Sequence, residues 1–252
     1  SKISSTTMTS SHTALDASTT LTLSATTGVN GDQGWLSTDV GRLVHIKDGH
    51  VKITSITSTT VAVGTVKAAI SNGSATDDWA LGSFSDTTGH PSCVTFFEQR
   101  LVFAGTSDQP QALFFSKSGQ YENFTAGTND TDAMIYTIAS NKVNAIRFLS
   151  AQRSLIVGTV GGEFVVSASG TTQPITPTNV QIQRQSSYGA ANVDAVQIEN
   201  VTMFLQRAKR KFREFKYSGE INASGYAAAD MSILSEHITL GGITDVAYQQ
   251  EP

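Results

Sequence analysis

The chain has 252 residues, of which 39% are hydrophobic and only 15% are charged, and its formal net charge is −4. This length favours two domains, and the composition excludes a disordered chain because apolar residues recur in alternation throughout. No apolar run approaches the roughly 18 residues of a membrane-spanning helix. The single cysteine, Cys93, excludes an internal disulfide framework and a cysteine-based zinc cluster, and we expect it to act as a small hydrophobic residue in a strand.

Residues 1–85 predict a small β-barrel or β-sandwich domain. Its expected strands lie at 21–25, 42–47, 50–56 and 60–66. Asp48 and Gly49 separate the second and third of these, and this pair favours a tight hairpin in which both residues have positive φ. The turn-rich segment 86–91 then leads into a different pattern.

Residues 86–252 predict an incomplete β-propeller, so the whole chain is expected to be all-β. A group of short strands recurs along this region, opening at Val94, Ile146, Val196 and Val246, at steps of 52, 50 and 50 residues. Repeats of about 40–50 residues with several short strands each are typical of propeller blades. The pattern predicts three blades and the start of a fourth. Because a closed propeller takes roughly four to eight blades, we expect this chain to be part of a longer protein.

One short helix is predicted, over residues 231–237. Asp230 is a suitable N-cap, and Gly241 and Gly242 follow as a stop signal. We expect Ile233 and Leu234 in this helix to pack onto the edge of the propeller.

Residue types that serve catalysis or metal binding are present, but without the spacing that such sites need. Of the five histidines, only His45 and His50 are expected to approach each other, across a hairpin, as exposed strand residues. The run from Asn129 to Asp132 holds two carboxylates but lacks the other ligands of a calcium loop, so we interpret it as a solvated turn. No nucleophile elbow, phosphate-binding glycine loop or zinc-protease motif occurs. The sequence therefore predicts no enzyme, no metal site and no cofactor site.

A basic segment at 207–216 stands out from an acidic background. It contains six of the seventeen basic residues, and the rest of the chain has 11 basic against 20 acidic residues. Three interpretations remain open: a solvated hairpin, a subunit interface that pairs with acidic groups, and a surface that faces DNA. The candidate residues are Arg207, Lys209, Arg210, Lys211 and Arg213. Between the last two interpretations we favour the subunit interface.

Several runs, in order along the chain, resemble the tail nozzle family of short-tailed bacteriophages, also called the tail tubular protein B family. They lie at 39–46, 93–106, 109–113, 118–124, 175–180, 184–189, 206–207, 210–214 and 236–238. The resemblance covers roughly residues 35–252. It implies a structural protein of the virion tail that forms a hexameric ring with other tail proteins as neighbours, and through which genomic DNA leaves. Family members are much longer than this chain.

The sequence leaves a second function open, a receptor- or carbohydrate-binding propeller module. Tyr121, Phe124 and Tyr188 are aromatic residues beside turn signals that suit such a role, although they also suit the anchoring of loops. A propeller glycosidase is a third class, but no pair of carboxylates is placed to serve it. The fold alone does not decide among these classes, since propellers carry unrelated functions.

Overall fold

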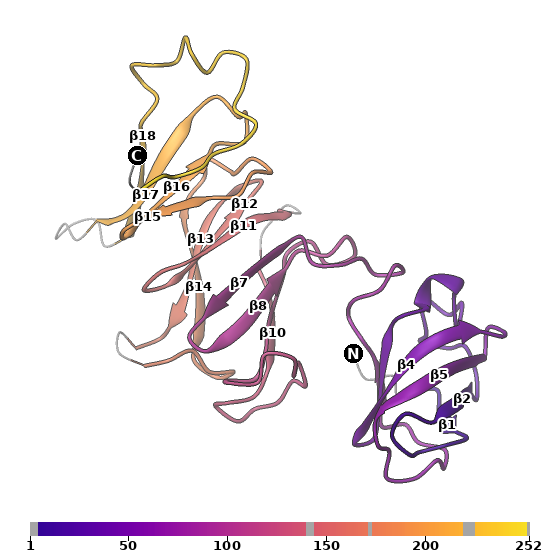
Figure 1. Cartoon of the computed structure of the whole chain (residues 1–252). Coiled ribbons are helices and arrows are strands. Elements are labelled where there is room, and N and C mark those ends of the chain that lie inside the picture. The colour runs from indigo at the N-terminus through magenta and orange to yellow at the C-terminus, as the bar shows by residue number, and fades with distance from the viewer. Residues whose placement is uncertain (1–4, 140–143, 171–172, 219–224, 251–252) are drawn as a thin grey trace. The chain divides into compact units, whose positions relative to one another are not determined.

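The computed structural model describes residues 5–139, 144–170, 173–218 and 225–250. The chain is all-β and consists of two compact units, Ser1–His90 and Pro91–Pro252 (Figure 1). The division thus falls between His90 and Pro91, whereas the sequence indicated a boundary after residue 85. Each unit has a hydrophobic core of its own.

The first unit is one six-stranded antiparallel sheet in the order β1-β2-β5-β4-β3-β6, with a single 3-10 turn, η1 (Ser37–Asp39). Its strands are β1 (Met8–Ser10), β2 (Ser18–Leu23), β3 (Leu43–Ile46), β4 (Gly49–Ile56), β5 (Val61–Ala68) and β6 (Trp79–Leu81). Alternating apolar residues give β2 and β3 one buried face each. Trp35 and Trp79 meet in the core, and the indole N–H of Trp79 donates to the carbonyl oxygen of Thr6 at 2.7 Å.

The predicted β3–β4 hairpin is confirmed, but its turn lies one residue earlier than expected. Ile46 pairs with Gly49, so the two turn residues are Lys47 and Asp48, and Lys47 has φ +54°. Gly49 belongs to β4, where a Cβ would lie 2.6 Å from the carbonyl oxygen of Ala68. Glycine is therefore required at this position by a close strand–strand approach, not by a positive φ.

A buried ion pair in the first unit accounts for the conspicuous run at 39–46. The carboxylate of Asp39 accepts from the guanidinium of Arg42 at 2.8 Å, from the backbone N–H of Leu36 at 2.9 Å and from the Thr87 hydroxyl at 2.8 Å. Arg42 also donates to the carbonyl oxygen of Gly82 at 2.8 Å. Both side chains are almost fully buried, so this run has a structural role in holding the loops of the sheet together.

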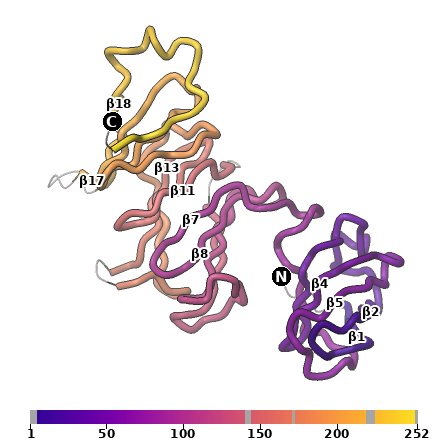
Figure 2. Tube along the Cα trace, viewed as in Figure 1, coloured from indigo at the N-terminus to yellow at the C-terminus, as the bar shows by residue number. Residues whose placement is uncertain are grey.

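The described residues of the second unit form three four-stranded antiparallel sheets, each built from four consecutive strands, in the manner of consecutive propeller blades (Figures 1 and 2). Blade 1 consists of β7 (Cys93–Phe97), β8 (Arg100–Ala104), β9 (Ala112–Phe115) and β10 (Met134–Thr137). Blade 2 consists of β11 (Ile146–Ala151), β12 (Leu155–Thr159), β13 (Gly162–Ala168) and β14 (Val180–Ser186). Blade 3 consists of β15 (Val196–Ile198), β16 (Val201–Leu205), β17 (Phe212–Ser218) and β18 (Gly225–Asp230). The expected all-β fold with consecutive blades is confirmed.

Blade 2 is covered on both faces because successive side chains of a strand point in opposite directions. Leu155 and Val157 of β12 join the core shared with blade 1, whereas Ile156 between them joins the core shared with blade 3. On the blade 3 side, the rings of Phe148 and Phe204 lie 5.6 Å apart. Cys93 belongs to the core between blades 1 and 2, as expected for a small hydrophobic residue.

The loop that precedes β10 is held by buried polar contacts. The buried guanidinium of Arg100 donates to the carbonyl oxygens of Ser116 at 2.8 Å, Asp132 at 2.6 Å and Asp130 at 2.6 Å. The Asp132 carboxylate pairs with Lys117 at 3.0 Å and accepts from the backbone N–H of Asn129 at 3.0 Å. The interpretation of 129–132 as a solvated turn is thus wrong for Asp132, which is buried.

The predicted helix at 231–237 is wrong. This stretch is a series of turns, in which Ser235 N–H donates to Ser232 at 2.9 Å and Ile238 N–H donates to Ser235 at 2.9 Å. Asp230 ends strand β18 opposite Arg213, and its side chain accepts from Ser232. The following residues are too few to offset the cost of helix nucleation. Ile233 and Leu234 do not pack onto the sheet but are exposed.

No strand begins at Val246, where the sequence predicted the start of a fourth blade. Residues 243–249 form none of the strands in the described part of the chain, although the alternation of apolar residues suggested one. A strand requires a partner that completes its hydrogen bonds, and no strand in the described part of the chain pairs with residues 243–249.

Candidate functional site

Residues 207–211 of the basic segment lie in the connection between β16 and β17 of blade 3, and residues 212–216 belong to β17. The backbone closes this turn through Gln206 N–H to the carbonyl oxygen of Lys211 at 2.9 Å and Lys209 N–H to that of Gln206 at 2.7 Å, and Lys209 has φ +60°. The tip of the turn presents Arg207, Lys209 and Arg210, all of which are exposed. We call these three residues the basic turn.

Lys211 lies beside this turn but is engaged within the chain. Its amine pairs with Asp230 at 2.9 Å and with Glu236 at 3.1 Å. Hydrogen bonds to these carboxylates raise the pKa of Lys211, and the same bond from Lys211 lowers the pKa of Asp230 to about 2. Lys211 therefore connects blade 3 to the segment that follows β18.

Arg213 points away from the basic turn, toward blade 2. It is buried, its Nε donates to Gln206 at 2.9 Å and its Nη1 donates to the carbonyl oxygen of Ala228 at 2.7 Å. The guanidinium carbon lies 3.5 Å from the centre of the Tyr188 ring, which is cation–π geometry. Of the five candidate residues, the structure thus brings three together at the surface and assigns Lys211 and Arg213 to internal contacts.

The sequence analysis did not identify a buried carboxyl group that lies near Arg213. Glu163, in β13, is fully buried, and the Ser186 hydroxyl donates to its Oε2. Burial raises the pKa of this carboxyl, against the effect of Ser186 and of the Arg213 charge. The sequence signal was an acidic residue inside the apolar run 162–168, where an exposed charge is not expected.

Two apolar surfaces were also missed. The first, here called the head surface, is the face of blade 1 that points away from blade 2, and its exposed residues are Val94, Phe96, Tyr121 and Ile135. The rings of Phe96 and Tyr121 meet edge to face at 5.2 Å, and those of Phe103 and Phe124 stack at 5.5 Å. The sequence pattern showed that both faces of these strands are apolar. It did not show that, among the described residues, no sheet covers the face that carries Val94 and Phe96.

The second surface, here called the tail surface, lies on the segment 231–250. It consists of the exposed apolar residues Ile233, Leu234, Ile238 and Leu240, and Met231 and Tyr248 of the same segment are exposed as well. This segment is held against blade 3 by backbone bonds from Met231 to Phe212 at 2.9 Å and from Ile243 to Lys209 at 2.7 Å. The second bond places Ile243 of this segment next to the basic turn.

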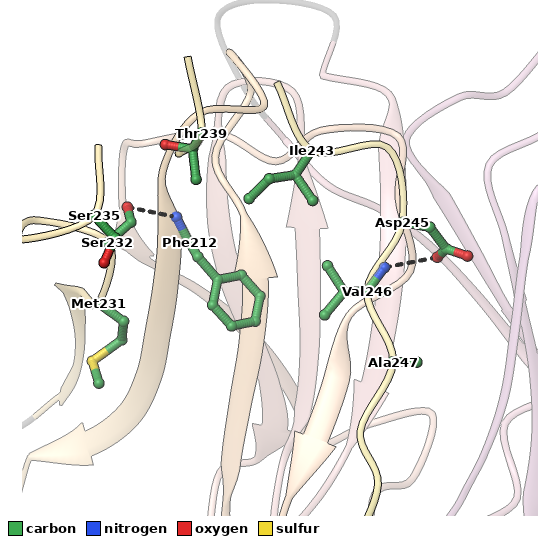
Figure 3. Close-up of a pocket in the computed structure, with 9 residues that line it drawn as sticks. All are labelled: Phe212, Met231, Ser232, Ser235, Thr239, Ile243, Asp245, Val246 and Ala247. Atoms are coloured by element: carbon green, nitrogen blue, oxygen red, sulfur yellow. Dashed lines mark hydrogen bonds between the residues drawn. The ribbon is translucent and has the colours of Figure 1, made fainter. Parts of the chain in front are cut away.

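Between the segment and the sheet lies a pocket of about 430 Å³. Figure 3 shows the Phe212 ring in this pocket with Met231 on one side and Ile243 and Val246 on the other. The lining is mainly aliphatic with a few hydroxyl groups, and the only charged side chain in it is Asp245. It offers no acid–base pair, so we interpret it as the space beneath the segment and not as a catalytic cleft.

His45 and His50 are opposite one another on β3 and β4, with ring centres 5.0 Å apart, as the hairpin predicted. They are half-buried, so the expectation that they are exposed is wrong. Burial lowers the pKa of His50. Over the described ranges of the chain, no three His, Cys, Asp or Glu side chains cluster so that they could hold a metal ion.

No helix in the described parts of the chain is long and apolar enough to cross a membrane. No protein-family model matches the chain, and neither does any curated protein.

Proposed function

We propose that this protein is a structural component of a bacteriophage virion, part of the nozzle of a short tail through which genomic DNA leaves. The observation that carries the proposal is a series of three blades whose two ends are apolar and exposed, next to an exposed basic turn. Such surfaces suit a protein that works by assembly with other proteins. The resemblance of the motif series to the tail nozzle family supports the same function.

In this function the basic turn contributes to contacts between subunits. A ring requires a patch on one subunit that complements a different patch on the next. Arg207, Lys209 and Arg210 offer three exposed cations on a chain that is otherwise acidic. Exposed charges of this kind steer assembly, and salt screens them over about 8 Å at physiological ionic strength.

The receptor- or carbohydrate-binding alternative receives no specific support. Phe124 stacks on Phe103, Tyr121 packs against Phe96, and Tyr188 lies under the Arg213 guanidinium. The three aromatic residues considered for this role thus make contacts within the second unit, while Tyr121 and Tyr188 are also exposed.

Electron microscopy of the purified protein, together with antibody labelling of intact phage particles, tests the proposal. We expect hexameric rings with a central channel, and labelling at the distal end of the tail. The double variant Arg207→Glu/Arg210→Glu should weaken ring formation at low salt, and the difference from the parent should shrink as salt rises.

Lys52→Glu/Arg153→Glu is the matched control, since it makes the same charge change at two other exposed positions. Absence of antibody labelling from the virion would contradict the tail function. Rings that form equally well in the Arg207→Glu/Arg210→Glu variant would contradict the role of the basic turn.

A further inference from the structure

We propose that Asn72 is a site of spontaneous modification, at which Lys47 promotes loss of the side-chain amide nitrogen. Asn72 is followed by Gly73 in the loop between β5 and β6 of the first unit. An asparagine followed by glycine cyclises readily, because glycine has no side chain that hinders attack by its backbone nitrogen. The inference concerns a covalent change within one chain and is independent of the proposed function.

The reaction consumes only water. The backbone nitrogen of Gly73 loses its proton and bonds to Cγ of Asn72, and negative charge collects on Oδ1. The Cγ–Nδ2 bond then breaks, and Nδ2 takes up a proton and leaves as ammonia, which gives a five-membered succinimide. Water adds to one carbonyl carbon of this ring and opens it. Residue 72 then carries a carboxylate, as aspartate or as isoaspartate.

The first argument is that the attacking and leaving groups are both free. Asn72 is exposed. Neither its Nδ2 nor the backbone N–H of Gly73 makes a hydrogen bond with the described part of the chain. The assignment of the two side-chain atoms is certain, because both groups that contact the other atom, Lys47 Nζ and Ser74 N–H, are donors and so require the oxygen. Cyclisation therefore breaks no contact of the fold.

The second argument is that two donors point at the oxygen on which charge develops. Lys47, in the β3–β4 turn, donates from Nζ to Oδ1 of Asn72, and the backbone N–H of Ser74 donates to the same oxygen at 3.2 Å. The amine is fixed there by two further bonds, to the carbonyl oxygens of Asn72 at 3.0 Å and Ser74 at 3.1 Å. A fixed cation at a developing oxyanion lowers the barrier of the step that forms it.

The same three bonds define the part that Lys47 plays. An ammonium group has three protons to donate and no lone pair. Because Lys47 donates to three acceptors, it acts as a donor to Asn72 and not as a nucleophile that would join the two side chains.

The third argument is the contrast with the other Asn-Gly dipeptide of the chain, Asn30-Gly31. The leaving nitrogen of Asn30 donates to the carboxylate of Asp39 at 2.7 Å, and its Oδ1 accepts from Arg42 at 3.0 Å. Cyclisation at Asn30 would break both bonds, and the product carboxylate would lie against the buried carboxylate of Asp39. The fold therefore protects Asn30 and leaves Asn72 reactive.

The product at position 72 suits its surroundings. A carboxylate oxygen in place of Oδ1 turns the bond from Lys47 into an ion pair, and charge-assisted bonds of this kind are stronger than bonds to an amide. The loop is already joined to the β3–β4 turn by the bond from Ser71 N–H to Asp48 at 2.8 Å. Modification thus adds one negative charge to the chain and strengthens an existing contact between the loop and the turn.

Mass spectrometry of peptides from the whole chain, digested after increasing times in neutral buffer, tests the inference. The peptide that contains residue 72 should gain about 1 Da. It should do so at least about tenfold faster than the peptide that contains residue 30, because the hydrogen bonds of Asn30 raise its barrier. In urea, where both sites lose their surroundings, the two dipeptides should react at similar rates.

Variants at Lys47 separate its effect from that of the dipeptide alone. Lys47→Met should slow the mass gain at Asn72 at least about threefold, a smaller factor than in a buried active site because solvent also reaches this oxygen. Lys47→Arg keeps the charge and the donors and should retain the parent rate. The matched control is Lys67→Met, which removes another cation of the same sheet that pairs with Asp16. Circular dichroism checks that each variant is folded.

The inference is overturned if Asn72 stays unmodified in the folded chain but reacts in urea, or if Asn30 reacts as fast as Asn72 in the folded chain. Unchanged kinetics in Lys47→Met would also overturn it, since the dipeptide would then react without help from the fold. A loss of about 17 Da, with the peptides of residues 47 and 72 joined, would overturn it by showing that Lys47 is a nucleophile.

Discussion

Strand β12 of blade 2 and strand β7 of blade 1 are similar in length and apolar content, but their surroundings differ. All five residues of β12 are buried, whereas β7 buries Cys93 and Phe97 and exposes Val94 and Phe96. The difference lies in the neighbours, since blade 2 has a sheet on each side and blade 1 has one sheet among the described residues. The comparison teaches that apolar residues on both faces of a strand are buried on both faces only where a sheet lies on each side.

The largest effect is expected when a ring on a buried sheet face and a ring on an exposed sheet face are removed and compared. Phe148→Ala removes a fully buried ring between blades 2 and 3 and should lower the free energy of unfolding by about 3–5 kcal/mol. Phe96→Ala removes an exposed ring and should change it by no more than about 0.5 kcal/mol. Urea denaturation followed by circular dichroism measures both. Trp35 and Trp79, the two tryptophans, lie in the first unit, so their fluorescence gives an internal reference.

Equal losses for Phe148→Ala and Phe96→Ala would show that the head surface is already covered within a single copy. The described difference between the covered faces of blade 2 and the exposed face of blade 1 would then be wrong.

The second prediction concerns the loop that precedes β10 in blade 1. Arg100 holds this loop, and Arg100→Met should lower the free energy of unfolding by about 2 kcal/mol because three carbonyl acceptors lose a charged donor. Arg153→Met, at an exposed turn of blade 2, is the control and should be nearly neutral. Thermal unfolding measures both, and a neutral Arg100 variant would assign the loop's order to apolar packing alone.

The third prediction uses the buried carboxyl of blade 2. The pKa of Glu163 is raised in the folded state, so the folded protein binds more protons there than the unfolded chain. Its contribution to stability is therefore fully present below the unfolded pKa, near 4.5, and is lost as the pH rises through the folded pKa. Glu163→Gln should remove this decline, whereas Glu199→Gln, at an exposed position, should retain it. Urea midpoints between pH 4 and 8 give the comparison, and identical slopes in the parent and Glu163→Gln would refute the assignment.

The smallest effect is expected at the junction of blade 3 with the segment that carries the tail surface. Lys211→Met removes the pairs with Asp230 and Glu236 and should speed proteolysis within residues 231–250 while the melting temperature barely changes. Arg210→Met, which alters an exposed neighbour, should leave the cleavage rate unchanged. Equal cleavage of the two variants would mean that the backbone bonds at Met231 and Ile243 hold the segment without Lys211.

The sequence by itself determined the fold class, because alternation and turn residues are local properties. The recurrence near residues 94, 146 and 196 marked the first strand of each blade, and Asp48 with Gly49 marked a hairpin. Each of these features depends on residues that are close together in the chain. Residues of the runs that resemble the tail nozzle family, such as Asp39, Arg42 and Arg100, make structural contacts within the chain. These contacts explain the fold and do not by themselves identify a function, so the function stays a proposal.

Only the tertiary structure decided which of the apolar and charged residues are available at the surface. The stretch after Asp230 suggested a helix, but pairing of β18 with β17 committed Asp230 to a strand. Lys211 and Arg213 looked equivalent to Arg210 in the sequence, yet cross-strand partners and the Tyr188 ring engage them. Phe96 and Phe148 are chemically identical, and one is exposed while the other is buried. The physical reason is common to all of these cases: burial and pairing depend on contacts between distant parts of the chain, which local sequence patterns do not contain.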